Sequence, residues 1–410
     1  MKRLKKLTLG ACIAALCAGA AMAQDARFVG WSYSEASSKP FIENEAAKVD
    51  GVDVELIGFP WSQMVQNLIL RHRSGQTTEV AQVQDRWMPM LVGMGALADL
   101  NDTLGADALA DTVEPGLLAM GQSNGGQYGV PWTAASIALV GNRELMEAAG
   151  VTELPATMED FHAALKKIKA ADPEAVPFGL STTNPNLIQV ESQVFFWQFG
   201  ARFFRDGAVA VDSAEAREAL AFLVQLVDEG LVAKGNDRNA TRALYGQGKV
   251  GFYFDPPVAR GIARNLSGEG EAFDENVVVM PTPTTGNGEP PRSVVWAHFL
   301  TSLTAGSPDT EAAGKVIEHF AMKPDVQLRY WNELGLFPTT KAALAELSDD
   351  AYVANWIELA RDALPDEPAA FENSAQLTQI IGEEIEAALL GIKSVDEAIT
   401  DMADRLEGAL

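Results

Sequence analysis

The order of strand-like and helix-like patterns near the start of the chain constrains its fold most. Arg27 to Trp31, Val52 to Ile57 and Glu79 to Val83 are short apolar runs of the kind that form strands. Between the second and third runs, Trp61 to Arg73 has helical periodicity, carried by Met64, Val65, Leu68 and Ile69. Alternating strands and helices are typical of βαβ units, whose parallel strands need helices on the sheet faces. We therefore expect an open α/β sheet in this part of the chain.

Helical patterns become more frequent further along. Thr157-Met-Glu-Asp160 has the residue types of a capping box and precedes apolar residues at helical spacing. Ser213 to Val227 is a second amphipathic helix, and the chain is mostly helical from Asp309 onward. Breaks rich in glycine, asparagine or proline, which we interpret as surface loops, lie at Gly121 to Gly129, Gly230 to Asn239 and Pro281 to Pro291. This organisation predicts two lobes joined by more than one crossing of the chain.

Residues 1–23 have the features of a secretory signal peptide. Four basic residues precede an apolar stretch over residues 7–20, and Ala21-Met22-Ala23 is an A-x-A cleavage site. The apolar stretch is shorter than the about 20 residues of a membrane-spanning helix. Both cysteines, Cys12 and Cys17, lie in this segment without a convincing lipobox. We therefore expect cleavage after Ala23 and a soluble, disulfide-free protein in the periplasm of a Gram-negative bacterium.

The remaining 387 residues are strongly acidic. The signal segment holds four of the 31 basic residues and none of the 56 acidic ones, so the rest carries 27 basic and 56 acidic residues, a formal charge of −29. Such a surface repels nucleic acids and anionic membranes at long range. It does not exclude an anionic small ligand, because binding depends on local groups. A length of 387 residues predicts two or three domain-sized units, and the 47% hydrophobic residues can form a sizeable core.

Motifs for catalysis or metal binding are scarce. The four histidines are scattered without H-E-x-x-H spacing and no cysteine follows the signal segment, so we expect no metal site and no cofactor. Gly121-Gln-Ser-Asn-Gly125 matches the G-x-S-x-G pattern of serine hydrolases, whose nucleophile needs a sharp strand-to-helix turn. A helical segment precedes Ser123 and a glycine-rich turn follows it, so we interpret Ser123 as a loop residue. Carboxylate pairs of the glycosidase type do not discriminate among 56 acidic residues, and we expect no catalytic residue.

The eight tryptophans are more informative. Several stand beside polar residues at the ends of predicted strands: Trp31 precedes Ser32, and Trp87 follows Asp85 and Arg86. Sugar rings present apolar C–H faces and hydroxyl edges, so aromatic side chains next to planar polar groups suit them. Open α/β sheets place such residues in a cleft at the carboxyl ends of the strands. Core packing is the alternative for each tryptophan taken alone, whereas the set as a whole predicts a carbohydrate site.

Several long motifs resemble one family of binding proteins. The sequence "YGVPWTAASIALVGNRELMEAAGV", followed by "LPATMEDFHAALKKI", is similar to the family-1 extracellular solute-binding proteins of ABC importers, the maltose-binding-protein-like group. Val80 to Leu100 resembles their strand, aspartate-containing ligand loop and helix, and "ALYGQGKVGFYFDPP" resembles their strand before a second ligand loop. A returning strand with its helix and a late turn are matched by "VVVMPTPTTGNGEPPRSVVWAHFLTSLTAGSPDTEAAGKVIEHF" and "LGLFPTT". The resemblance covers nearly the whole chain after the signal segment.

The resemblance implies two α/β lobes of the type II periplasmic-binding-protein fold, with a ligand cleft between them and a hinge of several strands. On this basis we expect residues 24–131 and 282–325 in the N-terminal lobe, and residues 132–281 and 326–410 in the C-terminal lobe. Pro131 and Trp132 would lie where the chain first crosses between the lobes. We expect Trp132 to face the cleft, and a buried hinge tryptophan that touches no ligand is the alternative.

The resemblance also implies ligand-binding positions. Asp85 would accept hydrogen bonds from vicinal hydroxyls, and Arg86 would fix that carboxylate or reach the ligand. Asp255 and Trp296 stand where the family often has an aromatic residue and a glycine, so no specific sugar follows. Trp197 would be a second stacking residue, with core packing as the alternative. The full set of expected ligand-binding residues is Trp31, Ser32, Tyr33, Asp85, Arg86, Trp87, Trp132, Trp197, Asp255, Trp296, His298 and Gly335.

These observations predict a periplasmic receptor that delivers a carbohydrate to the permease subunits of an inner-membrane ABC importer, as a monomer and without chemistry of its own. Two alternatives stay open. In the first, the same fold binds a polyol, a sugar phosphate or sulfonate, or another anion, with Arg86, Arg329 or Arg73 as bidentate clamps. In the second, the protein is a periplasmic sugar-modifying enzyme. Residue types alone do not separate these alternatives.

Overall fold

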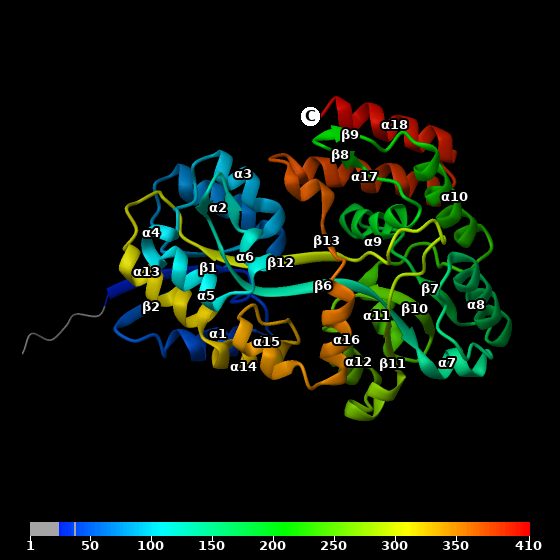
Figure 1. Cartoon of the computed structure of the whole chain (residues 1–410), viewed down its shortest axis with the longest axis horizontal. Helices are drawn as coiled ribbons and strands as arrows, with labels where there is room; N and C mark the ends of the chain where they lie inside the picture. The colour runs from blue at the N-terminus through cyan, green and yellow to red at the C-terminus, as the bar shows by residue number, and fades with distance from the viewer. Residues whose placement is uncertain (1–23, 37) are drawn as a thin grey trace, which may run out of the picture.

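The chain forms two α/β lobes that lie side by side along the long axis of the molecule (Figure 1). The computed structural model describes residues 24–36 and 38–410. The predicted signal peptide at residues 1–23 lies outside the described residues. Among these residues, no helix is long and apolar enough to cross a membrane.

The N-terminal lobe begins with the predicted βαβ units. β1 (Gln24–Gly30), β2 (Val52–Gly58) and β3 (Val80–Gln84) are parallel, and α1 (Lys39–Ala46) and α2 (Trp61–Arg73) connect them. The predicted strands and helix are therefore confirmed, with small shifts at their ends. The lobe is completed by η1 (Asp85–Trp87), α3 (Met88–Gly93), α4 (Asn101–Leu104), α5 (Ala106–Thr112), α6 (Pro115–Ala119), β4 (Gln122–Ser123) and β5 (Gly126–Gln127), and later in the chain by α13 (Thr310–Ile317), the π-helical turn η3 (Glu318–Met322), α14 (Pro324–Leu334) and α15 (Lys341–Leu347).

The C-terminal lobe combines parallel strands with a larger set of helices. The predicted capping residue Thr157 accepts a hydrogen bond from the backbone N–H of Asp160 and starts α8 (Met158–Ala171). The other elements of this lobe are α7 (Arg143–Ala148), β7 (Val176–Gly179), α9 (Pro185–Gln198), β8 (Phe204–Arg205), β9 (Ala208–Val209), α10 (Ala214–Asp228), α11 (Arg238–Gly246), β10 (Val250–Asp255), α12 (Ala259–Ser267), η2 (Gly270–Asn276), β11 (Val277–Met280), α16 (Ala351–Ala360), β13 (Leu364–Pro365), η4 (Glu367–Ala370), α17 (Ser374–Leu389) and α18 (Val395–Glu407).

A mixed sheet of nine strands, counted over the described residues, runs through both lobes in the order β2-β1-β3-β12-β6-β10-β7. Two long strands, β6 (Val130–Asn142) and β12 (Val294–Thr301), pair antiparallel and cross between the lobes (Figure 1). β11 also pairs with β6, and β13 pairs with β12. Because β10 runs antiparallel to β6, its carboxyl end points back to the hinge, as do the carboxyl ends of β1 and β3. The loops that follow β1, β3 and β10 therefore lie in one region between the lobes.

A β-bulge interrupts the first crossing strand. His298 pairs with Thr133, but the next residue, Phe299, pairs with Pro131, so Trp132 is the extra residue. Proline suits this place because it has no N–H that the ladder would leave unpaired. The carbonyls next to the bulge find partners from later in the chain. Thr339 Oγ1 donates to the Pro131 carbonyl at 2.6 Å.

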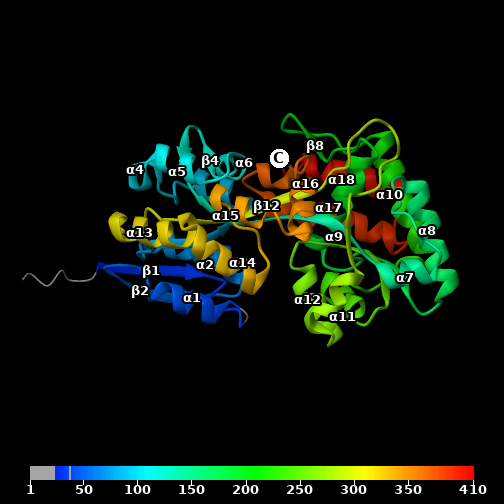
Figure 2. The same cartoon turned by 60° about the horizontal axis from the view of Figure 1, so that its bottom comes forward.

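The strand faces divide the apolar residues between two layers of helices. In β1, Ala26 and Phe28 pack on the side of α1 and α13, while Val29 packs on the side of α2 and α3. In the C-terminal lobe, the largest core joins β7 and β10 to α8, α9, α10 and α17. Figure 2 shows these helices together in this lobe, on the right of the picture. Each lobe therefore has its own core, and the crossing strands connect them.

Two segments lie in the other lobe from the one predicted. Thr284 bridges to Thr157, and Thr285 donates to the Gln198 carbonyl at 3.1 Å, so residues 282–293 stay with the C-terminal lobe until β12 begins. Conversely, α14 and α15 pack largely on the N-terminal lobe: Tyr330 belongs to its core, and Lys341 Nζ donates to the Ala110 carbonyl at 2.7 Å. The predicted boundaries at 282 and 325 are therefore wrong, because lobe membership depends on long-range contacts that no local motif encodes.

Candidate functional site

Aromatic side chains from four segments form a continuous group beside the hinge. Trp31, after β1, meets Trp87 edge to face, with ring centroids 5.6 Å apart, and also packs 4.7 Å from the His298 ring. Trp296 lies 4.6 Å from His298 on β12, and Trp61 at the start of α2 lies 5.9 Å from Trp87. Trp61 is 38% exposed and Trp296 is half-buried. We call these five residues the aromatic wall.

His298 is an uncharged member of this wall. Burial lowers the pKa of its imidazole to about 3, and the neighbouring Arg86 guanidinium lowers it further in the same direction. Nδ1 lies 3.3 Å from the Thr133 hydroxyl on the paired strand. The ring therefore stays neutral at physiological pH and offers a packing surface rather than a cation.

A polar group next to the wall joins the two lobes. Asp85 Oδ1 accepts the backbone N–H of Arg86 at 2.8 Å, which orients the carboxylate at the end of β3. Arg86 reaches the other lobe: its Nη2 lies 3.9 Å from Asp366 Oδ2, and its carbonyl accepts the Ser374 hydroxyl at 2.7 Å. Gln189 Nε2 on α9 donates to Asp366 Oδ1 at 2.8 Å. The loop after β3 is thus held against η4 and α17.

Burial shifts the ionisation of this group. It raises the pKa of Asp85 to about 6, while the Arg86 charge and the Arg86 backbone N–H oppose the shift and Asp366 adds to it. Two carboxylates from opposite lobes therefore share one incompletely paired arginine. The ionisation of such a group changes when the lobes move or when a ligand supplies hydrogen-bond donors.

Many polar atoms around this group have no hydrogen-bond partner among the described residues. Natural proteins leave few buried polar atoms unpaired, so a cluster of them indicates a place where a ligand or water completes the bonding. The acceptors and donors concerned are Gln84 Oε1, Asp85 Oδ2, Asp366 Oδ2, Gln189 Oε1, Arg86 Nε and Gln193 Nε2.

A hollow of about 650 Å³ opens beside these atoms and is lined by both lobes. The N-terminal lobe contributes Asp85 and Met88, and the C-terminal lobe contributes Phe204, Asp366 and Phe371. We call it the interlobe hollow. Its volume is in the range of small-molecule sites, and its mixture of apolar and polar lining groups is typical of them.

A second hollow of about 530 Å³ lies between α1 and α14 on one side and α11 and α12 on the other. Arg242 lines it and pairs with Asp255 at the carboxyl end of β10, with 2.5 Å between Nη2 and Oδ1. Gly335, in the left-handed conformation at φ 71°, ends α14 at its rim. Polar groups from both lobes thus border the cleft over a long distance.

The sequence comparison decides the family. The model of the family described as bacterial extracellular solute-binding protein matches residues 31–327. The chain belongs to the bacterial extracellular solute-binding proteins. A binding protein of Brucella abortus (strain 2308) is 25% identical over 407 residues, which cover 95% of each chain. The predicted family is thereby confirmed.

Solved solute-binding proteins share the fold over nearly their whole length. One, an ABC transporter solute-binding protein from Thermotoga lettingae bound with α-D-tagatose, has a TM-score of 0.82 at 20% identity, covering 94% of this chain and 99% of that one. Another, maltose-bound MalE3 of T. maritima, has a TM-score of 0.81 at 23% identity, with 95% and 100% covered. These likenesses confirm the two-lobe α/β fold of this solute-binding protein.

The structure brings six of the residues predicted for the site together: Trp31, Asp85, Arg86, Trp87, Trp296 and His298. Ser32 supports them from behind, because its backbone N–H donates to Gln82 Oε1 at 3.0 Å and its hydroxyl accepts from Gln82 Nε2 at 2.8 Å. Tyr33 turns to the far side of its loop, where Lys39 Nζ lies 4.9 Å from its ring centroid. Gly335 lines the second hollow, whereas Asp255 is buried and only pairs with Arg242, which lines it.

Trp132 and Trp197 do not face the cleft. Trp132 is 0% exposed and packs in the N-terminal core against Tyr330, 4.8 Å between centroids, so its expected orientation is wrong and the alternative of a buried hinge tryptophan holds. The alternation of the strand is the physical reason, since Val130, two residues earlier, lies in the same core and Trp132 shares its face. Trp197 is also buried and donates its indole N–H to Glu367. It positions η4 instead of offering a stacking face.

Sequence reasoning missed the C-terminal half of the site. Asp366 and Phe371, which line the hollow, carry no motif, and neither does Gln189, which reaches Asp366 only because α9 packs near η4. Trp61 had a usable signal, since it follows the proline after β2. Among the described residues no group of three metal-ligating side chains gathers, and Ser123 lies in the short strand β4.

Proposed function

We propose that this solute-binding protein captures a carbohydrate between its lobes in the periplasm and delivers it to the permease of an inner-membrane ABC importer. The observation that carries the proposal is the aromatic wall beside unpaired polar atoms of both lobes. Aromatic faces suit the C–H faces of a sugar, and the polar atoms suit its hydroxyls. The tagatose and maltose named for its structural neighbours support this ligand class.

Ligand capture would work by a shift between open and closed lobes. A sugar that contacts Asp85 on one lobe and Asp366 on the other binds the closed form better than the open one, and this difference in affinity drives closure. The crossing strands would bend while each core stays intact. The permease would then recognise the closed surface. The chain acts as a monomer and needs no cofactor in this proposal.

A thermal-shift screen tests the proposal. The mature protein is mixed with monosaccharides, disaccharides, polyols and anionic sugars, and tryptophan fluorescence is the second readout. A ligand at 100 times its Kd stabilises the folded state by about 2.7 kcal/mol. One sugar that raises the melting temperature and changes the fluorescence would support capture. No shift from any sugar, together with hydrolysis products from a glycoside, would favour the sugar-modifying enzyme instead.

Export is tested separately. We propose that residues 1–23 are removed after Ala23 and that the product is periplasmic. Mass spectrometry of the protein released by osmotic shock would then give an N-terminus at Gln24. A protein that retains residues 1–23 and sediments with membranes would contradict this part of the proposal.

A further inference from the structure

The charged side chains that line the interlobe hollow all have the same sign. Asp85, Asp206, Asp366 and Glu367 line it, and no lysine, arginine or histidine does so among the described residues. Asp85 comes from the N-terminal lobe, while the other three come from η4 or the β8–β9 hairpin. The hollow is therefore acidic on both sides of the cleft.

Two neighbouring arginines compensate this charge only in part. Arg86 Nη2 lies 3.9 Å from Asp366 Oδ2, and Arg202 Nε lies 3.9 Å from Glu367 Oε1, beyond hydrogen-bond distance in both cases. Glu367 is otherwise well paired, because its carboxylate accepts the Trp197 indole and the backbone N–H groups of Phe203 and Phe204. Its role is to hold the hairpin.

Two carboxylates keep a free acceptor. Asp85 Oδ2 and Asp366 Oδ2 are buried and have no hydrogen-bond partner among the described residues. Leaving such atoms unpaired is costly, so the filled site needs donors at both. Asp206 adds negative charge from the exposed turn of the hairpin, where its φ of 53° suits aspartate or asparagine.

We propose that the interlobe hollow selects a carbohydrate that brings hydrogen-bond donors and no negative charge, and that it binds an amino sugar more tightly than the hydroxyl parent. The proposal rests on the carbohydrate function proposed above and specifies its ligand class. An ammonium group donates three hydrogen bonds and offsets the carboxylate charge. A uronate, phosphate or sulfonate would place a like charge among these four carboxylates. The proposal therefore predicts against the anionic-ligand alternative.

The experiment compares matched sugars by calorimetry at pH 7.5 and low salt: glucose, glucosamine and glucuronate, with the same three derivatives of galactose and mannose. In the series that binds, we expect the amino sugar to bind at least tenfold more tightly than the neutral parent and the uronate at least tenfold more weakly. A uronate that equals its parent, or an amino sugar that binds more weakly than its parent, would overturn the proposal.

Charge variants link the selectivity to the hollow. Asp206→Asn and Asp366→Asn each remove one charge with little change in shape, and Asp107→Asn on exposed α5 is the matched control. Both hollow variants should reduce the ratio of amino-sugar to parent affinity several-fold, whereas Asp107→Asn should leave it unchanged. An equal effect of all three variants would show that general surface charge causes the selectivity, and would overturn the proposal.

A readout without sugar separates this inference from the proposed function. If the empty hollow carries uncompensated charge, Asp366→Asn raises the melting temperature of the empty protein at low salt, and Asp107→Asn does not. A lower melting temperature for Asp366→Asn would contradict the charge argument. If no sugar binds and Asp366→Asn still raises the melting temperature, the carbohydrate function is overturned while the charge preference of the hollow is supported.

Discussion

At the residue scale, two tryptophans of the crossing strands have opposite roles. Trp132 is the extra residue of the bulge in β6 and is wholly buried in the N-terminal core, whereas Trp296 on β12 is half-buried in the aromatic wall. Both looked like candidate stacking residues from sequence. Their neighbours in space, Tyr330 for Trp132 and His298 for Trp296, separate them.

Replacing each with alanine should therefore have different effects. Trp132→Ala should lower the free energy of unfolding by about 3–5 kcal/mol, because it leaves a large cavity in the core. Trp296→Ala should cost little stability and weaken sugar binding at least tenfold. Urea denaturation and calorimetry measure the two quantities. Similar losses of affinity in both variants after correction for unfolding would contradict this assignment.

Asp85 gives the chain a pH dependence of known sign. Its pKa is raised to about 6 in the folded protein from an unfolded value near 3.8, so the ionised form destabilises the fold. The protonated carboxyl, which carries no such penalty, predominates below about pH 4. Its contribution to stability is lost as the pH rises through about 6. Asp85→Asn should thus stabilise the empty protein by about 3 kcal/mol at pH 7.5 and by little at pH 4. Equal effects at both pH values in denaturant titrations would refute this account.

At the element scale, one glutamine connects three segments at the bulge. Gln327 Nε2 on α14 donates to the carbonyls of Trp132 and Ala321 and to Thr339 Oγ1, at 3.2, 2.6 and 2.8 Å. Its Oε1 accepts the backbone N–H groups of Thr339 and Thr340, both at 2.9 Å. The side chain thus fixes the first crossing strand to the segment after α14.

Removing this side chain should leave several buried backbone groups unpaired. Gln327→Leu is expected to lower the free energy of unfolding by at least about 3 kcal/mol, since each unpaired buried group costs about 1–3 kcal/mol. Gln376→Leu on the exposed face of α17 is the control and should stay within about 0.5 kcal/mol. Matching losses in the two variants would show that the contacts at the bulge add little.

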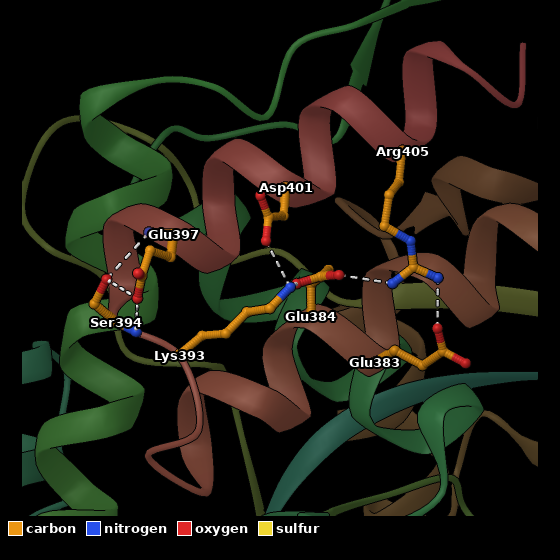
Figure 3. A network of polar contacts seen from close by, with 7 residues as sticks. All are labelled: Glu383, Glu384, Lys393, Ser394, Glu397, Asp401 and Arg405. Atoms are coloured by element: carbon orange, nitrogen blue, oxygen red, sulfur yellow. Dashed lines mark hydrogen bonds and ion pairs between the residues drawn. The ribbon is translucent and has the colours of Figure 1, made fainter.

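The C-terminal helical pair has an ionic network of its own, shown in Figure 3. Lys393 Nζ pairs with Glu384 Oε2 at 2.5 Å and with Asp401 Oδ2 at 2.7 Å, and Arg405 pairs with both Glu383 and Glu384. The Glu384 side chain is only 4% exposed. It therefore depends on its two basic partners, unlike an ion pair on the open surface.

Lys393→Met should lower the stability by about 1–2 kcal/mol, because Arg405 still neutralises part of the Glu384 charge. Arg361→Ala, the control, breaks an exposed pair with Glu358 and should change the stability by less than about 0.5 kcal/mol. Thermal unfolding at low and high salt distinguishes the two variants. A Lys393→Met effect as small as that of the control would mean that Arg405 alone suffices.

At the scale of the whole molecule, the lobes touch beside the hollow. Ser374 Oγ donates to the Arg86 carbonyl, and a Cβ added to Gly93 on α3 would lie 2.5 Å from Glu372 Oε1, just before α17. These contacts join the two lobes in this structure. Because both cysteines of the chain lie in residues 1–23, a disulfide engineered after them would have no competing thiol.

The double variant Gly93→Cys, Glu372→Cys should lock the lobes when oxidised. Sugar association should then slow at least tenfold, because ligand entry needs opening, and reduction should restore the rate. Stopped-flow tryptophan fluorescence measures the rate, and each single variant is the control. Unchanged association in the oxidised protein would show that the ligand enters without separation of these contacts.

The sequence by itself determined the local elements, the family and the position of the residues that form the N-terminal half of the candidate site. Strand and helix periods depend on near neighbours, and Asp85, Arg86 and Trp87 follow a strand whose end can be seen in the sequence. The loop after a strand stays with that strand in any fold built from it. For this reason these residues could be placed without coordinates.

Only the tertiary structure decided which lobe holds residues 282–293, which tryptophans face the cleft, and that Asp366 and Gln189 meet Arg86. These features depend on contacts between segments far apart in the chain and on a single extra residue in β6, after which the strand faces exchange, so that Val130 and Trp132 lie in one core and Ala134 lies in another. In a strand, a shift by one residue exchanges the two faces. No local pattern records that shift, so the orientation of the hinge residues is a property of the folded molecule.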